Sequence, residues 1–305
     1  MKRVKQVFGS TCFLLFAVAL TSVAALGQTV VVDPYAGIDW AAFEQHKANL
    51  HTHTTQSDGS ATPSQVIDEY WSRGYTILAL TDHNLCTWPW TELATMERKG
   101  RALQSDNAAR KEPDVPSEER KRPRVYAYEN REPEALGMLA IAGNEYSIHH
   151  HANGFFVEHE TRSRKLEQTI EEVGELGGLI VINHPGRYWD FAEDGTIPED
   201  VVARYATWCG DNPHVLGLEV INSGKRYPHD VKLWDAVLSN LMPEHTVWGF
   251  SNDDMHSVAR LGRDWDVFVI ESLDEAQVRG AMEKGQFYFC TVSTHPEEAR
   301  SVVET

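Results

Sequence analysis

The alternation of candidate β-strands with helical patterns constrains the fold of this chain more than any other feature. Apolar, β-rich runs lie at 48–53, 76–81, 138–145, 154–157, 178–183, 215–221, 246–251 and 266–270. Capping boxes opened by Thr62 and Ser272 begin two of the helices between them, and Gly285 ends the second. This alternation predicts an α/β fold with a mostly parallel sheet, and the number of units favours a closed barrel.

Polar residues of metal-binding types follow nearly every candidate strand. They are His51, His53, Asp58, Asp82, His83, Glu145, His184, Asp254 and His256. A lone histidine at a strand end is usually structural, but the repetition at several strand ends favours one shared site. In a parallel α/β barrel the active site forms at the C-terminal ends of the strands, so we expect these side chains to converge.

The types of these residues indicate which ions bind and which reaction follows. Histidine nitrogens with carboxylate oxygens, and without cysteine, suit zinc, manganese or iron. The residues outnumber the ligands of one ion, so we expect two or three divalent ions with Glu145 as a bridge. The sequence has no glycine-rich phosphate loop, no Gly-x-Ser-x-Gly motif and no dinucleotide fingerprint. Hydrolysis by a metal-bound hydroxide is therefore the leading reaction class.

The order of these motifs resembles the PHP family, which is named for polymerase and histidinol phosphatase domains. His-x-His with Ser-Asp-Gly is followed by Thr-Asp-His, Gly-x-Glu, His-Pro and Asp-x-His, between residues 46 and 292. The resemblance implies a distorted (β/α)7 barrel, similar to a TIM barrel, with its active site at the C-terminal ends of the strands. It also implies a phosphoesterase that acts on phosphomonoesters or phosphodiesters with a centre of two or three metal ions.

The resemblance also implies a division of the ligands among the ions. One ion takes His51, His53, Glu145 and Asp254, a second takes Asp58, His83 and His256, and a third takes Glu145, His184 and one further histidine. For this last ligand we choose His151, which begins a strand-like segment. His149 and His150 remain alternatives, because side chains that alternate in direction cannot all face one pocket. Asp254 is preferred to Asp253, since its two-residue offset places it on the same side as His256.

Other residues are candidates for a role around the ions. Arg187 is the first choice for a phosphate contact, because a guanidinium group matches phosphate oxygens. Weaker candidates on other strand-following loops are Lys225, Arg226, Arg260 and Arg263. Asp82 is expected to orient an imidazole or to bind a helix end. Glu219 and Asn222 line the pocket or support its ligands, with a purely structural role as the alternative.

The first 27 residues have the pattern of a secretory signal. Lys2, Arg3 and Lys5 precede an apolar run at 13–20 and small residues at 22–27. We therefore expect an exported protein, periplasmic or extracellular and without a stable membrane anchor, with a retained N-terminal anchor as the alternative. Residues 28–305 are expected to form one metallohydrolase domain, which carries a solvated, charged insertion near 97–135.

Charge and cysteine content limit the partners. The net charge is −17, and removal of the signal would make it more negative still, so nucleic acid is not expected to bind. A small phosphorylated substrate is expected instead, because metal ions reverse the local field. Beyond the signal, Cys86, Cys209 and Cys290 allow one disulfide without favouring a pair. The sequence predicts no particular oligomeric state.

Two other functions are compatible with a metal site. A metallohydrolase of an amide or lactone would use similar ions, because fold does not fix function. The usual amidohydrolase pattern includes a metal-bridging lysine at a strand end, and the sequence shows no lysine in that position. A non-catalytic metal-binding module is hard to reconcile with complete sets of ligands. Phosphoester hydrolysis is therefore preferred.

Overall fold

The structure is a computed structural model that describes residues 32–96, 128–224 and 226–292. All the elements named below belong to one compact unit, Asp33–Thr305, and Met1–Val32 form the other unit. The expected signal at 1–27, Lys225 and residues 97–127 of the expected insertion lie outside the described residues. Within the described part of the chain, no helix has both the length and the apolar character needed to cross a bilayer.

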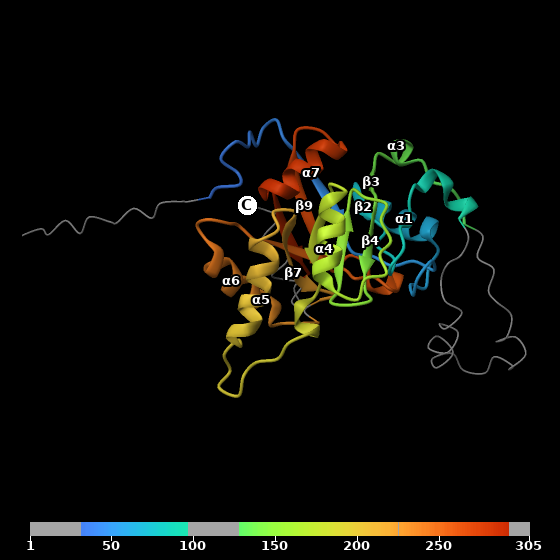
Figure 1. The fold of residues 1–305 in the computed structure, drawn as a ribbon. Coiled ribbons are helices and arrows are strands. Elements are labelled where there is room, and N and C mark those ends of the chain that lie inside the picture. The colour runs from blue at the N-terminus through green and yellow to red at the C-terminus, as the bar shows by residue number, and fades with distance from the viewer. Residues whose placement is uncertain (1–31, 97–127, 225, 293–305) are drawn as a thin grey trace, which may run out of the picture. The chain divides into compact units, whose positions relative to one another are not determined.

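The strands form two five-stranded sheets (Figure 1). The first sheet has the order β10 (Phe287–Thr291), β9 (Asp264–Ile270), β1 (Glu44–Asn49), β2 (Ile77–Ala79) and β3 (Leu139–Ile141). The second has the order β4 (Gly143–Tyr146), β5 (Ala152–Phe155), β6 (Leu179–Ile182), β7 (Val215–Asn222) and β8 (Trp248–Asn252). The runs β1–β2–β3 and β6–β7–β8 are parallel. The runs β1–β9–β10 and β4–β5–β6 are antiparallel.

The α/β class is confirmed, but both sheets are mixed rather than mostly parallel. Closure into a (β/α)7 barrel stays a prediction, because the described strands pair as two separate ladders. Where the sheets meet, isolated backbone bridges join Thr52 with Met255 and His83 with Glu145, and side chains bond to other backbone groups. The Ser251 N–H donates to Asp266 Oδ1 at 3.1 Å, and the Leu50 N–H donates to Asn252 Oδ1 at 2.7 Å. Polar side chains thus satisfy backbone groups that neighbouring strands leave unpaired.

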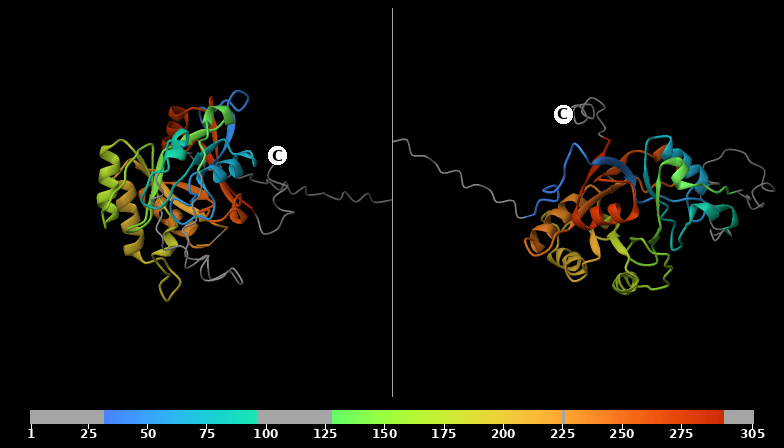
Figure 2. Two further views of the ribbon diagram at one scale, coloured as in Figure 1. Left: turned by 90° about the vertical axis from the view of Figure 1, so that its right-hand side faces the viewer. Right: turned by 90° about the horizontal axis from the view of Figure 1, so that it is seen from above.

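The helices pack against the sheets from outside. They are α1 (Pro63–Trp71), α3 (Pro133–Leu136), α4 (Leu166–Glu175), α5 (Glu199–Gly210), α6 (Asp230–Leu241) and α7 (Glu275–Lys284), with 3₁₀ turns η1 (Trp90–Thr95), η4 (Pro185–Arg187) and η5 (Val258–Arg260). Figure 2 shows α5 and α6 side by side and far from α1. The capping box at Thr62 is confirmed. The second helix begins later than expected, because Asp274 rather than Ser272 is its N-cap.

Three apolar clusters stabilise this arrangement and position the site. One lies between the sheets and includes Ile77, Phe155 and Phe250, all at most 1% exposed. Another packs α4, α5 and α6 against the second sheet, and a third packs α1 against β2. Burial of one large apolar side chain stabilises a fold by about 1.5–3 kcal/mol. The apolar core therefore holds the strands rigidly, and the polar residues follow at the strand ends.

Candidate metal centre

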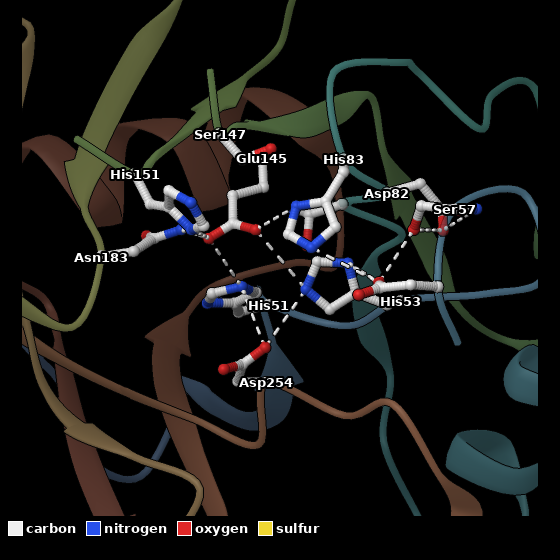
Figure 3. A network of polar contacts seen from close by, with 12 residues as sticks. His51, His53, Ser57, Asp82, His83, Glu145, Ser147, His151, Asn183 and Asp254 are labelled. Carbon is white, nitrogen blue, oxygen red and sulfur yellow. Dashed lines mark hydrogen bonds and ion pairs between the residues drawn. The ribbon is translucent and has the colours of Figure 1, made fainter. Parts of the chain in front are cut away.

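Side chains that follow β1, β2, β6 and β8 meet Glu145 of β4 and His151, which directly precedes β5, in one cluster (Figure 3). In each of four groups, one ligand atom per residue lies within 4.8 Å of all the others in that group. The groups are His51, His53 and Asp254; His53, Asp58, His83 and His256; His51, Glu145 and His184; and His83, Glu145 and His151. The structure thus brings together every residue expected to bind a metal, although they are far apart in the sequence.

The first group combines the two histidines after β1 with an aspartate after β8. His53 Nε2 lies 3.2 Å from Asp254 Oδ1, and His51 Nε2 lies 3.4 Å from the same oxygen. Their two-residue spacing directs both rings into one cluster, as the alternation of side chains along an extended chain requires. Asp254 has a positive φ of 44°, which is rare for a residue other than glycine. The fold therefore holds this carboxylate in a strained conformation that points at the histidines.

The second group lies at the exposed rim of the cluster. His256 Nε2 lies 3.2 Å from Asp58 Oδ1, and His83 Nε2 lies 3.4 Å from that oxygen. These side chains are 24–35% exposed, whereas that of His53, which also belongs to this group, is fully buried. The rim is therefore the side of the cluster that solvent and small molecules can reach.

Glu145 lies at the centre of the remaining groups. Its Oε1 is 2.9 Å from His151 Nδ1 and 3.2 Å from His184 Nε2, and its Oε2 is 2.7 Å from His83 Nδ1. Its Oε1 also lies 3.4 Å from His51 Nε2. One buried carboxylate thus contacts histidines of all the groups, which is the geometry that a bridging ligand needs.

The three consecutive histidines point in different directions. His151 faces Glu145, whereas His149 Nε2 lies 2.8 Å from Thr169 Oγ1 on α4. His150 Nε2 lies 2.7 Å from the Tyr205 hydroxyl on α5. Of the three, His151 contacts the cluster, whereas His149 and His150 face helices, because the chain bends at 148–150 before β5 begins.

Asp253 turns away from the cluster and organises the loop before β9. Its carboxylate accepts hydrogen bonds from the backbone N–H groups of Gly262 and Arg263, both at 2.7 Å, and from the Tyr70 hydroxyl at 3.0 Å. The neighbouring Asp254 is therefore the aspartate that the cluster can use. The two-residue offset from His256 pointed to the same choice.

The charges in the cluster are strongly perturbed by one another. Burial would raise the pKa of Glu145, but His51, His83 and His151 hold it well below its usual value. Burial would lower the pKa of His83, but Glu145 and Asp58 raise it to about 10. Burial, reinforced by the neighbouring His256 and His83, lowers the pKa of His53 to about 4. Glu145 and His83 therefore stabilise each other's charged forms, whereas the neighbouring imidazoles disfavour a charge on His53.

Several buried atoms of the cluster are suited to a divalent cation. Within the described residues, His51 Nε2, both ring nitrogens of His53, Glu145 Oε2 and His184 Nδ1 make no hydrogen bond. Several of these atoms lie in the ion pairs described above, but buried polar atoms without a well-formed hydrogen bond are costly and suit a further partner. Imidazole nitrogens and carboxylate oxygens are the ligands that zinc and similar ions take at about 2.0–2.2 Å. The residues present therefore fit the metal ions that the sequence predicted.

Asp82 supports the cluster without joining it. Its carboxylate accepts hydrogen bonds from the Thr54 backbone N–H and hydroxyl, both at 2.7 Å, and from the hydroxyls of Ser57 and Thr87, both at 2.6 Å. It therefore anchors the loop that carries Asp58, rather than orienting an imidazole or a helix end. The hydroxyl residues Thr54 and Ser57, which lie close to Asp58 in the sequence, could have indicated that a carboxylate anchors this loop. The sequence-based prediction for Asp82 did not consider them.

Asn183 is a supporting residue that sequence reasoning missed. Its side-chain amide donates to Glu145 Oε1 at 2.9 Å and to Asn153 Oδ1 at 2.8 Å. It precedes His184 directly, at the end of β6. An asparagine before a strand-end histidine carries no distinct chemical signal, so only the tertiary contact identifies its role.

The candidate phosphate contacts differ in their ion pairs with the cluster. Arg187 is exposed and forms no ion pair with any described residue, and its guanidinium carbon lies 5.9 Å from the centre of the Tyr188 ring. Arg226 Nη1 lies 3.5 Å from Asp254 Oδ2, and its side chain is 49% exposed. Arg226 therefore reaches a carboxylate of the cluster from the solvent side, although the sequence ranked it below Arg187.

No family model matches the sequence, and no curated protein matches it. Solved structures do resemble the chain. One is a two-domain protein containing a predicted PHP-like metal-dependent phosphoesterase from Bacteroides vulgatus, with 18% identity and a TM-score of 0.54, over 83% of this chain and 67% of that one. PsfC from Pseudomonas syringae is 14% identical over 85% and 97% of the two chains, with a TM-score of 0.47.

A third resemblance is to the lesion-specific endonuclease PfuEndoQ from Pyrococcus furiosus. It is 14% identical over 85% of this chain and 66% of that one, with a TM-score of 0.46. Only the Bacteroides protein has a TM-score above 0.5 among these three, so only that likeness is used below. At this level of identity the likeness shows a shared fold, and it agrees with the resemblance that the motifs predicted.

Proposed function

We propose that this chain is a metal-dependent hydrolase of small phosphate esters, because its fold resembles that of a two-domain protein containing a predicted PHP-like metal-dependent phosphoesterase. The observation that carries the proposal is the convergence of overlapping ligand groups on Glu145 at the strand ends. The distorted (β/α)7 barrel of the PHP type belongs to the same proposal. The cluster is buried at one end and open at the other, so it can accept a small anionic group at its rim.

The resemblance implies that the residues divide among two or three ions. His51, His53, Glu145 and Asp254 would hold one ion, and Asp58, His83 and His256 a second. Glu145 would hold a third ion with His151 and His184, whose ring nitrogens both lie near its Oε1. Zinc, manganese or iron bound there would supply Lewis-acid activation of a phosphoryl oxygen and of water.

The chain's own groups orient the substrate. Arg226 extends its guanidinium from the loop after β7 at the rim, where it can donate two hydrogen bonds to phosphate oxygens. Arg187 stays a second candidate on η4. The fully buried His51 and the nearly buried Glu145 close the inner end of the site, which limits the entry of water to the rim. The substrate therefore binds with its phosphate at the rim and its remaining part towards solvent.

Partners and location are also proposals. The net charge of −17 disfavours polyanions and supports a small phosphate ester as the substrate. The signal-like residues 1–27 support export to the periplasm or the outside of the cell. A cell fractionation that recovers the protein only in the cytoplasm would contradict export and leave the reaction untouched.

The proposal is tested with purified protein, a metal analysis and two aryl phosphates, one a monoester and one a diester. We expect two or three equivalents of transition metal and release of nitrophenol from at least one substrate. His83→Ala should lower kcat/KM by at least about 100-fold, because several kcal/mol of transition-state stabilisation depend on the ions. His149→Ala is the matched control, since that ring hydrogen-bonds Thr169 outside the cluster.

Two results would contradict the proposed phosphoester hydrolysis. Metal-loaded protein that leaves both phosphates intact, but cleaves an amide or lactone, would replace this proposal with the other metallohydrolase. Metal-loaded protein without any hydrolytic activity would leave a metal-binding module.

A further inference from the structure

Glu219 is a fully buried carboxylate in the middle of β7 that contacts residues of two metal positions. Its Oε1 lies 3.0 Å from His51 Nδ1, and its Oε2 accepts the backbone N–H of His184 at 3.1 Å. The same Oε2 accepts a hydrogen bond from Asn222 Nδ2 at 2.9 Å. One side chain thus connects a ligand from β1 with a ligand from β6.

The contact to His184 holds an unusual backbone. His184 has φ 27° and ψ 64°, a left-handed conformation that a residue with a side chain rarely adopts. Such a conformation persists only where the surroundings fix it, and the bond to Glu219 fixes the N–H of this residue. Asn222 extends the network, because its Nδ2 also lies 3.3 Å from Asp254 Oδ2. Asp254 likewise has a positive φ.

The contact to His51 determines which ring nitrogen is available to an ion. A carboxylate accepts, so the hydrogen of the neutral ring lies on Nδ1 and faces Glu219. The lone pair then lies on Nε2, which is 3.4 Å from both Glu145 Oε1 and Asp254 Oδ1. A carboxylate behind a histidine commonly fixes the tautomer of a metal ligand in this way.

We propose that Glu219 is a positioning residue that joins the two buried metal positions, one held by His51, His53 and Asp254 and the other by Glu145, His151 and His184. The rim position of Asp58, His83 and His256 has a different carboxylate beside it, Asp82, which binds Ser57 next to Asp58 and also Thr54 next to His53. The inference rests on the proposed metal centre and does not depend on the bond that the enzyme cleaves.

Glutamine cannot replace Glu219 in this network. The carboxylate accepts at both oxygens, from a ring N–H, a backbone N–H and an amide N–H. Glutamine offers one oxygen and one NH₂ group, so one of these donors would face another donor. If the NH₂ faces His51, the ring must move its hydrogen to Nε2 and loses the lone pair for an ion. If it faces His184, the strained turn loses its acceptor.

The test compares Glu219→Gln with Asp82→Asn in the full-length chain, with Co²⁺ as the probe ion. The readouts are bound cobalt per chain after dialysis and the visible spectrum of the cobalt sites. Glu219→Gln should weaken cobalt binding at the buried positions by about 10- to 100-fold, the usual effect of removing such a partner. Asp82→Asn should retain the buried cobalt and lose the rim ion. Wild-type cobalt content and spectrum in folded Glu219→Gln would overturn the inference.

A second measurement needs no variant. Long-range ¹H–¹⁵N spectra of the zinc-loaded wild-type protein report which nitrogen of His51 carries the hydrogen. The proposal requires it on Nδ1, and a hydrogen on Nε2 would overturn it even if the variant fails to fold. Neither readout measures phosphoester cleavage, so a failure here is distinct from a failure of the proposed function.

Discussion

The buried end and the rim of the metal centre use the same kinds of ligand but differ in their surroundings. The side chains of His51 and Glu145 are at most 1% exposed, whereas those of Asp58 and His256 are 35% and 34% exposed. Glu219 supports the buried end from a strand in the core, and Asp82 supports the rim through a loop. One short motif, 51–58, therefore supplies a buried ligand, His51, and a partly exposed one, Asp58. In the proposed function, the buried end would fix the geometry of the ligands and the rim would admit the substrate.

The largest expected effect comes from removing a ligand at each end in turn. His51→Ala should lower kcat/KM by at least about 1000-fold, and Asp58→Ala by about 100-fold, because each removes part of the Lewis-acid stabilisation. His51→Ala should deplete the buried ion and lower the melting temperature of the metal-loaded protein. Asp58→Ala should deplete only the rim ion. Metal analysis and thermal denaturation of both variants check this, and identical metal loss in the two would remove the distinction between the ends.

An intermediate effect is expected for the arginines at the rim. Arg226→Ala should raise KM for an aryl phosphate by about 10-fold with bound metal unchanged, because it removes a charge-assisted hydrogen bond to the phosphate. Arg187→Ala is the matched comparison and should have a smaller effect, since Arg187 has no ion pair with the described residues around the cluster. Steady-state kinetics on both variants decide the order. A larger effect of Arg187→Ala would restore the ranking that the sequence favoured.

The smallest expected effect concerns the pH dependence of the stability of the fold, through a buried aspartate near the buried end of the cluster. Asp230 is 1% exposed and packs against Gly186, in the turn that follows His184. Burial raises the pKa of Asp230 from 3.8 to about 8. The folded state thus keeps a proton that the unfolded state has released, so this group lowers stability as pH rises from about 4 to about 8.

Asp230→Asn removes that dependence. The variant should melt at a higher temperature than the wild type at pH 8.5. This gain in melting temperature should be at least about 2 °C larger at pH 8.5 than at pH 5. Thermal denaturation at the two pH values measures the difference. Asp235→Asn, on the exposed face of the same helix, should show no such change. A gain for Asp230→Asn that is equal at both pH values would mean that the carboxylate is ionised in the folded protein.

Much of the candidate site follows from local sequence patterns. The two-residue spacing of His51 and His53 directs both rings to one side, and the same rule separates His151 from His150. An offset of two residues also distinguished Asp254 from Asp253. The placement of these side chains agrees with those inferences, although Asp254 reaches the cluster through a positive φ rather than through an extended segment. The capping box at Thr62 is also a local pattern, and it is confirmed.

Other features depend on contacts between distant segments. The antiparallel pairing of β9 with β1, and of β5 with β4 and β6, divides the strands into two mixed sheets where the sequence predicted mostly parallel pairing. Nothing local distinguishes such strands from parallel ones. The roles of Asp82 and Asn183 likewise arise only where distant residues meet.

The sequence alone indicated which residues of this protein have the chemistry to bind ions, and that they follow the ends of strands. The tertiary structure decided which of them are buried, which form the rim, and that Glu219 connects two ligands from different strands. The physical reason is that residue type and alternation are fixed along the chain. Burial, hydrogen-bond partners and strained turns such as that at His184 are fixed only when the sheets pack together.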